Sequence, residues 1–205
     1  MLDKKLFWNY FLAMTELTGK KPSKALAKIY YETVKNLTNE EFERAAKVLL
    51  STYRYAKIPS PAEILEIVHG DPDDRAQLAA ELVLKAIETY GQYESVNFED
   101  PIINCIIANQ QGGWPAFCQV TYEEWKFKRQ EFIKLYKSYL RKPELIKPIK
   151  YLPGEIEMDN FRRGLTGTNN RIHRIAAPYI SDSEKRIDRS KGILDSKNLQ
   201  EIADG

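Results

Sequence analysis

The segment Ile58-Pro59-Ser60-Pro61 constrains the fold more than any other stretch of the sequence. Two prolines separated by one residue exclude a continuous helix, because each lacks a backbone N–H donor and disfavours helical geometry in the residue before it. A new helix is expected to begin directly afterwards: Ser60 is placed to cap it, Pro61 suits the first helical position, and Glu63 can complete a capping box. The segment therefore predicts an elbow between two groups of helices.

Helical periodicity dominates residues 1–70, which we predict to form a helical N-terminal lobe. The clearest apolar stripe follows Thr38. Glu41 can complete a capping box with Thr38, and from Phe42 onward apolar residues recur at intervals of three and four residues. The spacing predicts helices over residues 6–17, 23–36, 38–53 and 62–68.

Residues 71–142 repeat the same start and stop signals and predict a second helical lobe. Asp71-Pro72 and Asp100-Pro101 each combine a capping aspartate with a first-turn proline. The β-branched isoleucines after Pro101 leave a strand possible, but the cap and the spacing favour a helix. Residues 92–99 are interpreted as an exposed link, 114–118 as a turn or single helical coil, and 121–142 as a long helix.

Beyond residue 142 the apolar residues thin out, and Pro143, Pro148 and Pro153 interrupt the chain. We therefore expect residues 143–205 to form an extended tail with short helical pieces at 155–163, 182–189 and 196–203. No stretch alternates convincingly with a period of two. The predicted fold class is all-α, with two small helical lobes joined at the proline-rich elbow and an extended C-terminal tail.

Composition indicates a cytoplasmic protein without a membrane anchor or a cofactor. The formal net charge of +2 is nearly neutral, so any contact with nucleic acid must be local. Cys105 and Cys118 lack the spacing of a zinc or redox site and are expected to be buried, reduced thiols. Near the N-terminus no long apolar run follows the charges, so we expect no signal peptide.

The sequence offers no recognisable catalytic residues, and we expect a protein that is not an enzyme. His69 lies at an expected helix end, where a cation is favourable, and no motif around His173 makes a triad or a metal set. The acidic pairs lie in first helical turns, where the helix dipole accounts for them.

Two features are candidates for binding a partner. Residues 161–174 contain four arginines and no acid, and glycines between them would allow close approach to phosphates. The alternative is a solvated basic tail. Trp114, in Gly-Gly-Trp-Pro, could present an interface side chain, although a tryptophan after a glycine turn more often packs over its own helices. The candidate contacts are Arg162, Arg163, Arg171, Arg174 and Trp114.

Residues 8–67 carry a family resemblance. The chain places Ile29-Tyr30-Tyr31 on a short helix, follows it with Glu41-Phe42 and Ala45-Ala46 on the next, and closes with Ile58-Pro-Ser-Pro-Ala-Glu-Ile64. This order resembles the N-terminal domain of phage replicative-helicase loaders and inhibitors, the replisome organisers. Ile58 replaces an aromatic residue of the family elbow, and Ser60-Pro61 replaces its small pair. Residues 100–140 are similar to an uncharacterised domain of prophage replication modules.

The resemblance implies a phage or prophage DNA-replication adaptor that binds the host replicative helicase and loads or inhibits it. Its tail would contact the helicase or adjacent single-stranded DNA, while its helical body would hold an origin-binding protein or itself. No catalytic residue is implied, because such loaders act by binding. The alternative is a phage DNA-binding or regulatory protein that uses the arginine segment on phosphates. The oligomeric state stays open.

Overall fold

The structure is a computed structural model that describes residues 1–19, 21–52, 57–165 and 171–181. Within these ranges the chain is predominantly helical, as predicted. It divides into two compact units, composed mainly of Met1–Asp71 and Pro72–Ile180. The division falls next to the boundary expected after Gly70.

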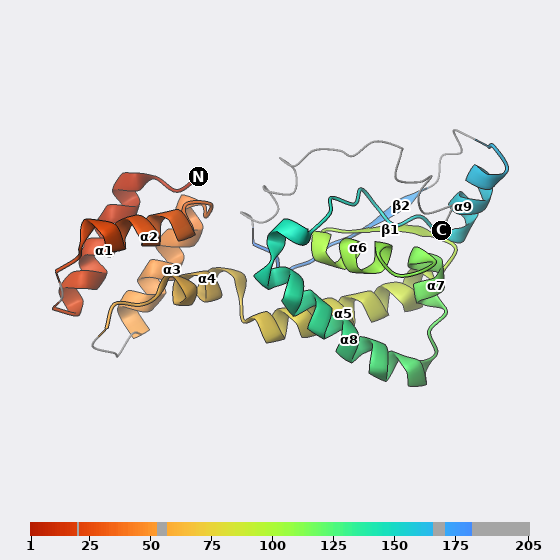
Figure 1. The fold of residues 1–205 in the computed structure, drawn as a ribbon, viewed down its shortest axis with the longest axis horizontal. Coiled ribbons are helices and arrows are strands. Elements are labelled where there is room, and N and C mark those ends of the chain that lie inside the picture. The colour runs from red at the N-terminus through yellow and green to blue at the C-terminus, as the bar shows by residue number, and fades with distance from the viewer. Residues whose placement is uncertain (20, 53–56, 166–170, 182–205) are drawn as a thin grey trace. The chain divides into compact units, whose positions relative to one another are not determined.

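The first unit is a small assembly of helices (Figure 1), and its core is rich in aromatic side chains. Phe7 and Phe11 of the first helix are buried and stack with ring centroids 5.5 Å apart, and Phe7 also contacts Phe42 at 5.8 Å. The buried positions follow the period of three and four that the sequence predicts. The helices are α1 (Lys4–Leu17), α2 (Lys24–Val34), α3 (Asn39–Thr52) and α4 (Pro61–His69).

The proline elbow begins α4 in the way the sequence predicts. The backbone N–H of Glu63 donates to the Ser60 hydroxyl at 3.3 Å, and the Ser60 N–H donates to the Glu63 carboxylate at 2.6 Å. These bonds satisfy two backbone donors that a helix start leaves open. They also lower the pKa of the Glu63 carboxyl, because the ionised form accepts the backbone hydrogen bond.

The second unit contains most of the remaining helices. The β-branched segment after Pro101 is helical and is buried on all sides from Ile102 to Ile107, which explains its uniformly apolar composition. Asp100 caps it by accepting from the Ile102 N–H at 2.9 Å. The elements are α5 (Pro72–Tyr90), α6 (Pro101–Ala108), α7 (Gly113–Cys118), α8 (Tyr122–Arg141), the 3₁₀ turn η1 (Pro143–Leu145) and α9 (Glu155–Arg162).

The prediction that residues 92–99 form an exposed link is wrong. Its second half forms β1 (Ser95–Phe98), whose Val96 and Phe98 are buried. This strand lies beside β2 (Ile172–Ile175) in Figure 1. The two strands pair in parallel, with Val96 opposite His173. Val96 also exchanges two backbone hydrogen bonds with Leu152, at 3.0 and 2.8 Å. The segment is therefore enclosed on both edges by chain that follows much later in the sequence.

An asparagine side chain ties β1 to the helix that follows it. The Asn104 amide accepts from the Phe98 N–H at 3.2 Å and donates to the Phe98 carbonyl at 2.8 Å. Asn104 is buried, so this pair of bonds satisfies backbone groups that water does not reach. The last residue of the strand is thereby held against α6.

The predicted extended tail also differs from the structure over residues 146–165 and 171–180. Leu152, Ile175 and Ala177 are buried, and Gly154 lies so close to the backbone of Tyr93 that an added Cβ would stand 2.3 Å from the Tyr93 carbonyl oxygen. These two ranges therefore belong to the second unit and contribute a few buried apolar residues to it. The predicted helix at 155–163 corresponds to α9. Those at 182–189 and 196–203 lie outside the described residues.

Candidate partner-binding site

Helix α8 is held in the second unit by its buried apolar face and by a capping box at its N-terminus. Trp125, Phe132 and Tyr136 are buried on the side that packs against α5 and α6. Thr121 and Glu124 form a capping box, with the Thr121 N–H donating to the Glu124 carboxylate at 2.9 Å. The side chains on the other faces of α8 therefore occupy defined positions.

A buried polar cluster anchors the middle of α8. Asp100, which is 1 % exposed, accepts hydrogen bonds from the Tyr136 hydroxyl at 2.5 Å and from the Tyr179 hydroxyl at 3.1 Å. Arg75 of α5 is buried nearby, and its charge favours the ionised carboxylate. Burial nevertheless raises the pKa of Asp100, because removal from water disfavours the charge more than these partners favour it. The cluster joins α5, α6, α8 and the chain after β2.

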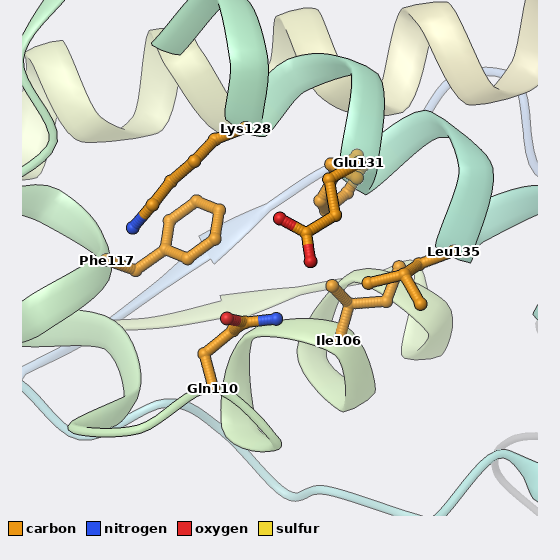
Figure 2. A pocket seen from close by; sticks show the side chains of 7 residues that line it. Ile106, Gln110, Phe117, Lys128, Glu131 and Leu135 are labelled. Carbon is orange, nitrogen blue, oxygen red and sulfur yellow. The ribbon is translucent and has the colours of Figure 1, made fainter. Parts of the chain in front are cut away.

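A shallow pocket opens beside α8 (Figure 2). Its cavity volume is only about 10 Å³, room for roughly one water molecule, and it is open to solvent. The wall is mainly apolar, and Lys128 and Glu131 of α8 supply one charge of each sign. The Lys128 ammonium lies 5.5 Å from the centre of the Phe117 ring. The lining residues are Ile106, Gln110, Phe117, Lys128, Glu131, Phe132 and Leu135.

Two aromatic side chains of α8 project into solvent. Phe127 is 81 % exposed and Tyr122 is 76 % exposed. The Lys126 ammonium lies 5.8 Å from the centre of the Tyr122 ring, whereas Phe127 directly precedes the pocket residue Lys128. An exposed aromatic ring among charged side chains is suited to contact with an apolar side chain of a partner.

Sequence reasoning missed this site. Three elements bring its lining together, namely α6, α7 and α8, and only the fold shows that they meet. One signal was present: on a helical projection, Phe127 falls outside the stripe that contains Trp125 and Phe132. An aromatic residue off the buried stripe of a well-capped helix indicates an exposed ring.

The four candidate arginines are exposed but do not lie in a detached tail. Arg162 ends α9, and the next residue, Arg163, forms an ion pair with Asp159 at 2.7 Å. Arg171 precedes β2, and Arg174 lies within it. Residues 166–170, which connect the two pairs, lie outside the described residues. Both pairs are thus attached to elements that pack on the second unit.

Trp114 is not exposed to a partner. Its side chain is 0 % exposed, and its indole N–H donates to the carbonyls of Gly91 and Glu94 at 3.0 and 3.1 Å. The ring also packs edge-on against Phe98, with centroids 6.0 Å apart. Of the two sequence interpretations, the structure places this tryptophan in the core.

The described residues contain neither a metal-ligand group nor a membrane-spanning helix. No three His, Cys, Asp or Glu side chains among them cluster in a way that could hold a metal ion. In the same part of the chain, no helix combines the length and the apolar character needed to cross a membrane. Cys105 and Cys118 are free thiols, and burial raises the pKa of Cys118 to about 12.

Comparison with known families gives one match. Residues 96–174 match a family model described as Domain of unknown function (DUF6475). No curated protein matches the chain. No solved structure matches it either. The matched range begins in β1 and ends in β2, so it unites residues 143–174 with the helices before them.

Proposed function

We propose that this protein is a non-enzymatic adaptor of a phage or prophage replication module that binds the replicative helicase of the bacterial host. The proposal rests on the resemblance of residues 8–67 to helicase loaders and inhibitors. The observation that supports it is that the first unit is helical and that a capped proline elbow starts α4, as the resemblance implies. Its action would be stoichiometric, through preferential binding to one conformation of the helicase ring.

We place this contact on helix α1 and not on the tail that the resemblance implies. Trp8 and Leu12 are 40 % and 41 % exposed and lie one helical turn apart on the same face. The Trp8 ring packs edge-on against Phe7 and Phe11, with centroids 6.1 and 6.0 Å apart, so it is held in place by the core. A supported, half-exposed tryptophan beside a leucine is typical of the anchors that dominate protein interfaces.

We expect Trp8→Ala to weaken helicase binding about 30-fold, the effect of losing a hot-spot side chain. Leu12→Ala should act in the same direction with a smaller effect. The measurement is size-exclusion chromatography with light scattering of the full chain mixed with the host helicase, followed by titration calorimetry.

Leu17→Ala is the matched control. Leu17 is also an exposed leucine of α1, 71 % exposed, but it lies on a different face from Leu12. Its loss should leave helicase binding unchanged. The proposal is wrong if the helicase elutes unchanged with the intact protein at both low and moderate salt.

The second candidate function is binding to nucleic acid through the arginines, and the exposure of all four favours it. Arg171→Gln combined with Arg174→Gln should reduce affinity for a labelled single-stranded oligonucleotide. It should also lower the slope of log affinity against log salt by about 1.4, because about 0.7 is lost for each phosphate contact. Fluorescence anisotropy over a salt series measures both quantities.

Arg163→Gln provides the comparison for this experiment. Because Arg163 is paired with Asp159, its removal should change the salt slope less than the loss of an arginine that binds phosphate. Absence of binding at low salt, or equal slopes for the intact protein and the double variant, would exclude this function.

A further inference from the structure

Strand β2 forms the outer edge of the small sheet. Strand β1 is enclosed, because Leu152 pairs with it on one side and β2 on the other. Within the described ranges, β2 has a strand neighbour on one side only. An outer strand edge presents backbone donors and acceptors to which a further extended chain can bind.

The register identifies the backbone groups of β2 that point away from β1. The Glu99 N–H donates to the Ile175 carbonyl at 2.9 Å. In this parallel register, the bond directs the N–H and C=O of Ile175 toward β1, and those of His173, two residues earlier, point the same way. The N–H and C=O of Ile172 and Arg174 therefore point to the outer edge, where no backbone group of the described residues pairs with them.

The side chains at this edge are exposed, and their charge is positive. Ile172 is 38 % exposed, Arg174 is exposed as well, and the two lie on the same face of the sheet because they are two residues apart. Arg171, which directly precedes β2, is also exposed. No ion pair between described residues includes either arginine. The edge therefore combines outward backbone groups, one apolar side chain and two basic side chains whose charge is not neutralised.

These groups select one kind of occupant. A phosphate backbone only accepts hydrogen bonds, so it cannot pair with the outward carbonyls of Ile172 and Arg174. A second copy of β2 would bring its own arginines against Arg171 and Arg174, and like charges on paired strands are destabilising. An extended peptide that carries carboxylates can pair with the donors, the acceptors and the arginines together.

We propose that the outer edge of β2 binds an acidic, extended segment of a partner protein, which adds to the sheet as a further strand. The segment carries an acid and an apolar residue separated by one residue, so that both lie on the face of Arg174 and Ile172. This inference does not depend on the helicase contact at α1. The nucleic-acid candidate uses the same arginines, so the experiment also includes an oligonucleotide.

The first test uses two labelled peptides of identical composition and the full chain, with binding measured by fluorescence anisotropy. Acetyl-Thr-Glu-Thr-Val-Thr-Glu-Thr-amide places both acids and the valine on one face of a strand, and it should bind. Acetyl-Thr-Glu-Val-Glu-Thr-Thr-Thr-amide has the same charge but places the valine on the face opposite the acids, and it should bind more weakly.

Backbone pairing has its own readout. Two versions of the first peptide carry N-methyl groups, one on each set of alternate amides. Because alternate amides of a strand face the same neighbour, one version should lose binding and the other should keep it. On binding of the unmethylated peptide, amide exchange followed by NMR should slow at Ile172 and Arg174. Exchange at Ile175 should change little, because its N–H already points to β1.

Variants of the chain separate the backbone contact from the charge. Ile172→Pro removes an outward N–H at the first residue of β2, where proline is tolerated, and should weaken peptide binding about 10-fold. Arg174→Gln should weaken it about 5-fold, the effect of losing one exposed ion pair. Arg44→Gln makes the same change of charge at an exposed position of α3 and should have no effect. Circular dichroism checks that the variants are folded.

Three results would overturn the inference. The first is absence of peptide binding at the highest soluble concentration, including the case in which a single-stranded oligonucleotide binds instead. The second is equal binding of the two peptides of identical composition, which would reduce the contact to net charge. The third is binding that both N-methylated versions retain, because a peptide that adds to β2 has to present one set of its amides to that strand.

Discussion

Asp100→Ala should destabilise the second unit by about 3–5 kcal/mol, the cost of removing one partner of a buried charge network. The substitution removes a carboxyl group close to the buried Arg75 charge and deprives the Tyr136 and Tyr179 hydroxyls of their acceptor. It also removes the cap of α6. Denaturant unfolding followed by hydrogen exchange, which separates the two units, measures the loss.

Glu88→Ala is the control for this experiment, since Glu88 is an exposed acid of α5 and its loss should change stability by less than about 0.5 kcal/mol. If Asp100→Ala proves equally mild, the cluster contributes little to the stability of the unit.

The same carboxyl gives stability a pH dependence with a defined sign. The folded-state pKa of Asp100 is raised, so the folded state holds the proton to higher pH than the unfolded chain, whose carboxyl titrates near about 3.9. The contribution of Asp100 is therefore complete below that value and is lost as pH rises through the folded-state pKa. Asp100→Asn should remove this part of the pH dependence.

Trp114→Ala should cost about 3–5 kcal/mol of the unfolding free energy of the second unit, as expected for a large buried aromatic side chain. The loss combines a cavity beside Phe98 with two carbonyls, Gly91 and Glu94, that lose their shared donor. Trp114→Phe should cost less, because it retains much of the packing and loses only the hydrogen bonds and part of the ring.

This prediction also separates the two interpretations of Trp114. If Trp114 contacted a partner, its truncation would weaken binding and leave the stability of the protein unchanged. If Trp114 is a core residue, its truncation lowers the stability of the protein first. Urea unfolding of the two variants, with exchange rates assigned to β1 and α7, is the measurement. Unchanged protection of these elements in Trp114→Ala would contradict the core assignment.

The helices were predictable because the residues that cap their N-termini are close together in the sequence. Ser60 with Glu63, Thr121 with Glu124 and the Asp100 cap act within a few residues, and the structure contains the corresponding bonds. The strands were not predictable in this way. Each has only four residues, and β1 becomes a strand because β2 and Leu152 arrive from far along the chain.

The packing of residues 146–165 and 171–180 escaped prediction for a related reason. Leu152 is 23 residues from Ile175, and Ile175 and Ala177 alone are too few to show a period, yet each is buried. The sequence identified the four arginines, but not the folded elements that carry them. The candidate site by α8 could not be predicted either, because Phe117 and Glu131 become neighbours only through the meeting of α7 and α8.

The pairing of β1 with β2 has a consequence for the order in which the chain can fold during synthesis. Met1–Asp71 contains nearly all the residues of the first unit and can fold as soon as it leaves the ribosome. The second unit has to wait, because Val96 lacks both neighbours until Leu152 and His173 have been made. During that interval β1 has two open edges, the arrangement most prone to pairing with other chains. A protein cut at residue 143 would remain permanently in that state, so removing the C-terminal segment would test aggregation rather than partner binding.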